Sequence, residues 1–314
     1  MDGLTFLKRV MSTDPVPVVV CSGFAEPGTR QAMRALEAGA VDVALKPRVR
    51  ADGTVEDGAV ALLESVRAAA QARLRSTAAP VAASAAPVAP AAGSTTGVHR
   101  VRRPTAAIDL NASREDWVVA MGASTGGTEA LRDVLRALPV SAPGIAVVQH
   151  MPEGFTAAFA QRLNEICTIE VREARHDDRL TPGLALIAPG NRHMRIHRRG
   201  AAYVVELDDG PRVCRHRPSV DVLFHSVARA ARDRAVGVLM TGMGADGADG
   251  LLAMRQTGAH TIAQDEATCV VFGMPKEAID RGAVRLVLPL PRIAAAMTQP
   301  PPRDSMAKEI GSKK

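Results

Sequence analysis

Short apolar runs alternate with segments of helical length between residues 114 and 298. The runs at 117–121, 145–149 and 235–240 carry almost no charge, which is typical of strands buried on both faces of a parallel sheet. Amphipathic segments at 128–138 and 155–166 follow the first two runs. This alternation predicts an α/β fold with a doubly wound, mostly parallel sheet and helices on both faces.

The pattern changes between residues 170 and 207, where apolar residues recur at every second position, as in 202–207. This periodicity predicts a small antiparallel excursion from the main sheet. Helices expected at 220–231 and 248–256 then restore the alternation. Together these patterns predict one α/β domain that spans residues 114–298.

The N-terminal zone predicts part of a second α/β unit, with strands at 17–22 and 41–45 and helices near 1–11, 32–39 and 58–75. Residues 76–113 are rich in Ala and Pro and predict a semi-extended linker. Its basic cluster at 99–103 lacks interleaved aromatic residues, so a solvated linker is favoured over a nucleic-acid contact. The Pro- and Lys-rich tail at 299–314 is expected to be disordered.

Composition narrows the class of protein further. The chain is 46% hydrophobic and 23% charged, with a formal net charge of +6, as expected of a globular protein rather than a disordered one. Its four cysteines are scattered without a Cys-x-x-Cys pair, which favours reduced thiols over a disulfide framework. With no apolar run of 18 residues and no leader pattern in this sequence, we expect a cytoplasmic protein without membrane insertion.

Three predicted strands end in residues that can carry chemistry. Ser124 stands in Gly122-Ala-Ser-Thr-Gly-Gly, His150 follows the second strand, and Asp246 lies in the Gly-rich loop after the third. Gly-x-Ser-x-Gly is typical of a nucleophile elbow, although a phosphate cradle or a plain tight turn fits the same letters. Because carboxyl ends of parallel strands meet at one edge, the three residues together supply the hydroxyl, imidazole and carboxylate of an acyl-transfer triad.

These blocks resemble the signature motifs of the chemotaxis protein-glutamate methylesterase (CheB) family. Similar blocks begin at Ala188 and Ala263, and Arg217-Pro-Ser-Val-Asp lies between them. The resemblance implies Ser124 as nucleophile, His150 as base and Asp246 as orienting acid, with Thr125 and Met243 near the oxyanion. It implies hydrolysis of glutamate methyl esters on chemotaxis receptors, accompanying glutamine deamidation, and no cofactor or metal.

The N-terminal zone resembles the C-terminal part of a phospho-receiver domain, assigned to residues 1–75. Ser22 matches the switch hydroxyl and Lys46, before Pro47, the phosphate-sensing lysine. The phospho-acceptor aspartate and the acidic metal pair have no counterpart in this chain. We therefore expect either that the receiver is truncated or mis-started, or that control by phosphorylation is lost. A chemotaxis histidine kinase is expected as a partner only if a full receiver exists. Such a fragment is expected to cover the Ser124 site poorly. The competing possibility is that it docks through the helix near 58–75 and blocks substrate.

Other classes of site and function are disfavoured. His193 and His197 have His-x-x-x-His spacing, but neighbouring arginines at 192, 195 and 198 would repel a metal ion. A dinucleotide-dependent oxidoreductase would need Gly-x-Gly-x-x-Gly and an acid after the next strand. A DNA-binding output would need a helix-turn-helix or a basic recognition helix. The arginines between residues 192 and 217 form either a solvated face or a basic rim that suits acidic receptor helices.

Overall fold

The computed structural model describes residues 2–23, 26–47, 58–73 and 117–299, with the side chains of residues 26–30 left aside. The expected linker at 76–113, including its basic cluster, and the tail from residue 300 onward lie outside the described residues. Within them, no helix is both long enough and apolar enough to cross a membrane.

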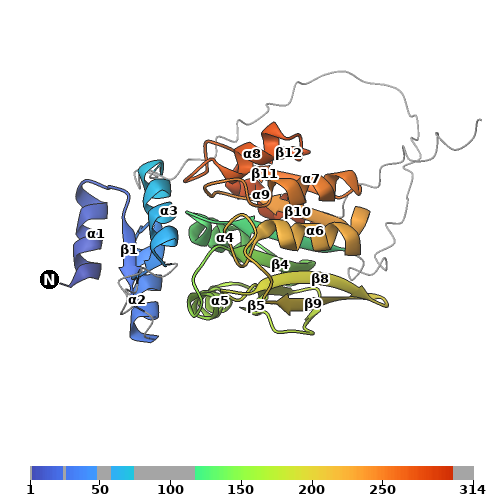
Figure 1. Cartoon of the computed structure of the whole chain (residues 1–314), viewed down its shortest axis with the longest axis horizontal. Coiled ribbons are helices and arrows are strands. Elements are labelled where there is room, and N and C mark those ends of the chain that lie inside the picture. Colours follow the sequence, from blue (N-terminus) through green and yellow to red (C-terminus); the bar gives the residue numbers. More distant parts are fainter. Residues whose placement is uncertain (1, 24–25, 48–57, 74–116, 300–314) are drawn as a thin grey trace, which may run out of the picture.

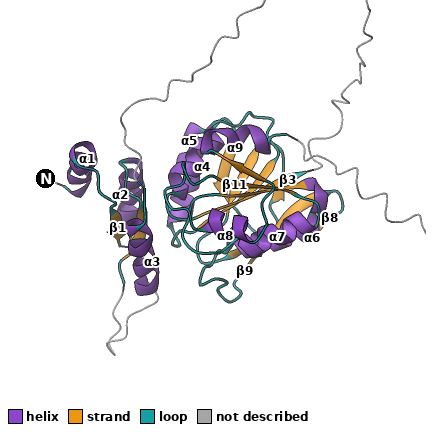
Figure 2. Ribbon diagram, turned by 90° about the horizontal axis from the view of Figure 1, so that it is seen from above, coloured by secondary structure: helices purple, strands orange, loops and turns teal. Residues whose placement is uncertain are grey.

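A seven-stranded parallel sheet forms the centre of the larger unit (Figure 2). Its order is β12-β11-β10-β3-β4-β7-β5, so the chain leaves β3 on one side through β4 and returns to β10 on the other. Ligands of such sheets bind where the winding reverses, at the carboxyl ends of the strands. The bounds are β3 Val118–Ala123, β4 Gly144–Gln149, β5 Glu170–Glu173, β7 Leu184–Ile187, β10 Ala235–Leu239, β11 His260–Gln264 and β12 Leu286–Leu288.

Helices cover both faces of this sheet, which confirms the predicted fold class (Figure 1). On β3, Val119 and Met121 join one apolar core while Val118 and Ala120 join the other, because side chains alternate between faces along a strand. The first core lies under α4 Gly127–Arg136, α5 Phe155–Ile166 and α9 Leu290–Met297, and the second under α6 Val220–Ala230, α7 Ala248–Gln256 and α8 Met274–Asp280. The short helix η1 spans Arg232–Arg234.

The predicted antiparallel excursion is present but smaller than expected. Strands β6 Arg179–Leu180, β9 Ala202–Asp208 and β8 His193–Arg199 form a three-stranded antiparallel sheet. Strands β5 and β7, from the same stretch, instead extend the parallel sheet. All four residues of β7 are buried, so this strand is covered on both faces as the centre of a parallel sheet requires.

The N-terminal unit contains α1 Gly3–Thr13, β1 Val19–Ser22, α2 Glu26–Glu37, β2 Asp42–Leu45 and α3 Gly58–Ala70. The carboxylate of Asp2 caps α1 by accepting hydrogen bonds from the N–H groups of Leu4 and Thr5, and β1 pairs with β2 in parallel. Helix α2 packs on α4 and α5, where Glu37 pairs with Arg162 at 2.6 Å. In Figure 1 this unit lies beside the larger one, with α3 nearest to it.

Candidate active site

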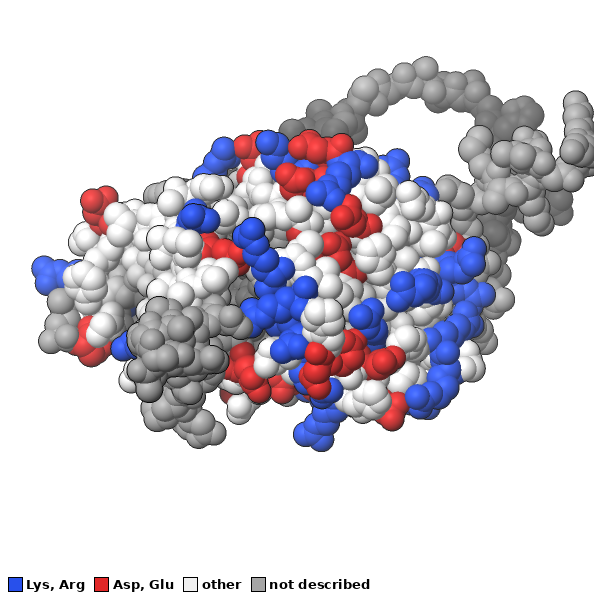
Figure 3. Space-filling model, in the orientation of Figure 1, with Lys and Arg blue, Asp and Glu red and all other residues white. Residues whose placement is uncertain are grey.

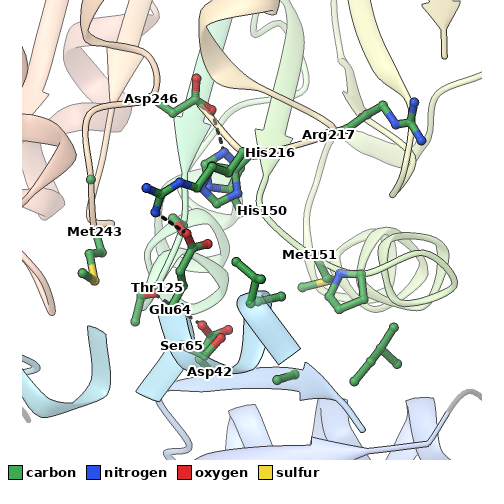
Figure 4. A pocket seen from close by; sticks show the side chains of 18 of the residues that line it. Asp42, Glu64, Ser65, Thr125, His150, Met151, His216, Arg217, Met243 and Asp246 are labelled. Carbon is green, nitrogen blue, oxygen red and sulfur yellow. Dashed lines mark hydrogen bonds and ion pairs between the residues drawn. The ribbon is translucent and has the colours of Figure 1, made fainter. Parts of the chain in front are cut away.

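A cavity of about 950 Å³ lies at the carboxyl ends of β3, β4 and β10. Ser124, His150 and Asp246 all line it, as do Thr125 and Met243. Residues of β2 and α3 line the opposite side, so the cavity lies between the two units (Figure 4). The five residues singled out in the larger unit are therefore brought together at the edge expected from the strand order.

Ser124 lies in a sharp turn between β3 and α4. Its N–H donates at 3.0 Å to the carbonyl of Thr241, which lies two residues beyond the end of neighbouring β10. A Cβ on Gly127 would lie 2.1 Å from Oε1 of Gln149 and 2.7 Å from Cβ of Ala123, so a side chain there would displace the Gln149 amide. The Gln149 Nε2 donates to the carbonyls of both Ser124 (2.9 Å) and His150 (3.1 Å). One buried amide thus fixes the backbone at two of the candidate residues, a role that no sequence pattern indicated.

His150 and Asp246 form a buried pair, with His150 Nε2 2.7 Å from Asp246 Oδ2 and side chains 7% and 2% exposed. Asp246 also accepts hydrogen bonds from the Ser219 hydroxyl and from the N–H groups of Val220 and Asp221. Burial raises the pKa of this carboxyl, but the hydrogen bonds and the nearby imidazole outweigh it, and the pKa falls to about 2. Asp246 is therefore ionised at neutral pH.

The other ring nitrogen of His150, Nδ1, is buried and has no hydrogen-bond partner among the described residues. When Nε2 carries the proton donated to Asp246, Nδ1 presents a lone pair. Buried polar atoms without partners are uncommon and often mark a functional site. This lone pair belongs to a side chain that lines the same cavity as Ser124, so the imidazole is equipped to accept a proton there.

His216 is a site residue whose placement the sequence did not indicate. Its ring stacks on that of His150 with centroids 3.7 Å apart and planes 12° apart (Figure 4). Burial, and then the neighbouring His150, lower the pKa of His216 to about 3. A neutral ring therefore covers one face of the candidate base. In the sequence, only the closeness of His216 to the motif that begins at Arg217 could have suggested that it lies near His150.

Thr125 and Met243 both line the cavity that Ser124 lines (Figure 4). Among the described residues, the backbone N–H of neither one is occupied by a hydrogen bond to a carbonyl. The buried Thr125 donates its hydroxyl hydrogen to Oδ2 of Asp42 at 3.4 Å. Burial raises the pKa of Asp42, more than its own hydrogen bonds lower it. Two backbone donors at the cavity remain available for a ligand.

Ser22 is the last residue of β1, and Lys46 directly follows the last residue of β2. The Lys46 N–H donates to the Ser22 carbonyl at 2.8 Å, and Lys46 itself lines the cavity. The two residues therefore lie at adjacent strand ends, and their receiver-type roles stay a prediction.

The N-terminal unit covers the cavity, contrary to the expectation that it would be a poor lid. The Val41 carbonyl accepts from the Gly126 N–H at 3.3 Å, next to the Asp42–Thr125 hydrogen bond. Glu64, on α3, accepts from Arg215 at 3.2 Å. Burial of apolar residues such as Leu7 and Leu36 in the first core accounts for this packing: even two strands and three helices bring enough apolar surface to dock.

Most arginines of the expected basic rim are already paired. Arg192, Arg195 and Arg199 bind Asp209, Asp208 and Asp177, and Figure 3 shows blue and red groups interspersed over much of this face. Arg217 donates to Asn191 and to the carbonyls of Asp209 and Gly210. Much of the rim therefore stabilises the fold.

The side chains that could bind a metal ion in this structure are not the histidines with His-x-x-x-His spacing. His193 Nε2 lies 2.9 Å from the Pro211 carbonyl, and His197 pairs with Glu206. Within the described ranges, one group of three possible ligand atoms lies within 4.8 Å: Cys214, Asp221 and Asp246. Both Asp246 oxygens already accept hydrogen bonds, and burial raises the pKa of the Cys214 thiol to about 11. The donor set is thus engaged in the fold rather than arranged around an ion.

Comparisons with known proteins agree on one family. A model of the CheB methylesterase family matches residues 119–297. A protein-glutamate methylesterase/protein-glutamine glutaminase 1 from Anaeromyxobacter dehalogenans is 59% identical over 95% of this chain and 82% of its own length. A protein of the same name, numbered 2, from Xanthomonas campestris pv. campestris is 54% identical over 94% and 82%. The crystal structure of the Thermotoga maritima CheB methylesterase catalytic domain, 37% identical, superposes with a TM-score of 0.57, covering 58% of this chain and 97% of that one.

Proposed function

The chain belongs to the CheB methylesterase family, and from that premise we propose that it hydrolyses glutamate methyl esters, and deamidates glutamines, on chemotaxis receptors. Its relatives carry both activities in their names. We propose residues 114–298 as the catalytic domain and 1–75 as a partial receiver that covers it. Family membership removes the dinucleotide-dependent and DNA-binding alternatives.

In this proposal Ser124 is the nucleophile, His150 the general base and Asp246 the orienting acid. Ser124 Oγ attacks the ester carbonyl while its proton moves to His150 Nδ1. The C–O bond then breaks, and methanol leaves with the proton that His150 returns. Water repeats the sequence on the acyl-enzyme and releases glutamate. On a glutamine side chain, ammonia leaves instead of methanol.

The backbone N–H groups of Thr125 and Met243 would stabilise the oxyanion. A single such donor is typically worth about 10²–10³ in kcat. Asp246 holds the imidazole through Nε2 and stabilises its protonated form. The neutral ring of His216 excludes water from one face of His150 without adding a competing charge.

One observation carries the proposal: a buried imidazole is bound to an ionised carboxylate on one nitrogen and is unpartnered on the other, in the cavity that holds Ser124. Ser124→Ala tests it, with methanol release from methylated receptor and fluorophosphonate labelling as readouts. We expect a loss of at least 10³-fold and no labelling, because the nucleophile is removed while little cavity is created. Retention of activity within tenfold of wild type would refute the assignment.

A further inference from the structure

A tight hairpin at Val213–His216 presents one arginine at the cavity. Val213 and His216 exchange both backbone hydrogen bonds, and the two residues between them, Cys214 and Arg215, have φ values of 49° and 68°. Positive φ at both central residues is the geometry of a type I′ turn. Residues other than Gly, Asn and Asp rarely adopt it, and such conformations cluster at functional sites. The hairpin ends on His216, which stacks on His150, so Arg215 is fixed beside the candidate base.

Arg215 differs from Arg217, which also lines the cavity. The guanidinium of Arg217 is committed to Asn191 and two carbonyls of the same domain, and Figure 4 shows it turned away from His150. The ion pair that the described residues form with Arg215 comes from Glu64 on the covering helix α3. The side chain of Arg215 is 75% exposed. Within the described part of 117–299, no carboxylate pairs with Arg215.

The carboxylate of Glu64, on the N-terminal unit that covers the cavity, therefore pairs with a guanidinium to which the described part of the catalytic domain supplies no carboxylate. We propose that Arg215 binds a carboxylate of the polypeptide substrate close to the scissile ester, and that Glu64 takes the same place when α3 covers the cavity. This inference rests on the proposed function. The reaction itself produces glutamate side chains, so a substrate segment with several modifiable positions carries carboxylates beside its remaining esters. On a helical substrate, a carboxylate three or four residues from the ester lies on the same face.

Two peptides distinguish this role from a structural one. Each contains a single glutamate methyl ester in a helical segment; one has glutamates three and four residues to either side, and the other has alanines there. With the full chain we expect kcat/KM for the acidic peptide to exceed that for the neutral one by about three- to tenfold. Arg215→Gln should bring this ratio close to one, Arg215→Glu should invert it, and Glu64→Gln should raise kcat/KM for the acidic peptide. Arg229→Gln, exposed and outside the cavity, is the matched control and should keep the wild-type ratio.

An unchanged ratio in Arg215→Gln, or an equal loss on both peptides, would overturn the proposal, because either result assigns Arg215 to the fold or to the catalytic groups. If the wild-type chain hydrolyses neither peptide, the proposed function fails, and peptide binding then decides the role of Arg215. Fluorescence anisotropy with the Ser124→Ala chain measures the two dissociation constants directly. A preference for the acidic peptide that disappears in Ser124→Ala/Arg215→Gln supports the proposal, and equal affinities before that change overturn it.

Discussion

Asp246→Asn is expected to damage both stability and catalysis, because the carboxylate accepts four hydrogen bonds. Oδ1 accepts from the Ser219 hydroxyl (2.7 Å) and the Asp221 N–H (3.0 Å), and Oδ2 from His150 Nε2 (2.7 Å) and the Val220 N–H (2.8 Å). An asparagine offers one acceptor oxygen and one NH₂ group. In either amide orientation a backbone N–H faces another donor, so at least one buried N–H loses its partner.

The expected loss of unfolding free energy can be worked out in two ways. An orphaned buried donor costs about 1–3 kcal/mol. A pKa of about 2 in the folded protein, against the ordinary 3.8, corresponds to about 2 kcal/mol at neutral pH. Both routes give about 2 kcal/mol, or a melting temperature lower by roughly 4–8 °C for a domain of this size. The catalytic loss should be larger, because the same substitution in a serine-protease triad lowers kcat by about 10⁴.

The pH dependence supplies a sharper check. The folded-state pKa of Asp246 is lowered, so its stabilisation is present above the unfolded pKa near 3.8 and disappears as the pH falls through about 2. Urea unfolding of wild type and Asp246→Asn should differ fully at pH 7 and progressively less below pH 4. Asp249→Asn, an exposed neighbour on α7, is the control and should change the unfolding free energy by less than about 0.5 kcal/mol. Equal stability of wild type and Asp246→Asn at pH 7, or a rate within tenfold of wild type, would refute the reasoning.

Three further changes test other parts of the site. Gly127→Ala should lower kcat at least tenfold, because its Cβ would displace the Gln149 amide that holds the Ser124 and His150 carbonyls. The control is Gly3→Ala, where the added Cβ meets no other atom. Equal rates for the two variants would contradict this prediction. Asp42→Asn should raise the melting temperature at pH 8, because burial raises the pKa of Asp42 and disfavours its ionised form. The difference in melting temperature between wild type and variant should shrink as the pH falls toward that pKa. A lower melting temperature of the variant at pH 8 would be evidence against this reasoning. Deleting residues 1–75 should raise the esterase rate severalfold, because Asp42 and Glu64 no longer engage the cavity; an unchanged rate would show that the cover does not inhibit.

Sequence periodicity predicted the regular parts of this fold well. Helices α5 and α7 begin and end where the apolar stripes do, and β3, β4 and β10 coincide with the apolar runs to within a few residues. Period-two patterning misassigned β7, however, because Leu184–Ile187 is a short apolar run within an alternating stretch. A run of four apolar residues fits either sheet, and only its partners β4 and β5 decide which one.

The candidate site was predictable in its strand-end residues and not in their surroundings. Parallel strands must bring Ser124, His150 and Asp246 to one edge, so three motifs sufficed to locate the cavity. The stacking of His216 on His150 and the Gln149 hydrogen bonds depend on side-chain contacts between segments far apart in the chain. No local pattern encodes such contacts. The same holds for the cover, whose docking depends on the apolar surface it shares with α4 and α5.

If the substrate binds as proposed, it competes with the N-terminal unit for some of the same groups at the cavity. Asp42 engages the Thr125 hydroxyl, Val41 the Gly126 N–H, and Glu64 the guanidinium of Arg215. If each such contact contributes about 1 kcal/mol, the three polar contacts together favour the covered state by roughly 150-fold. An acidic substrate that supplies its own carboxylate to Arg215 replaces one contact as it displaces α3. Apolar burial docks the N-terminal unit, and the polar part of the balance depends on the charges at positions 64 and 215.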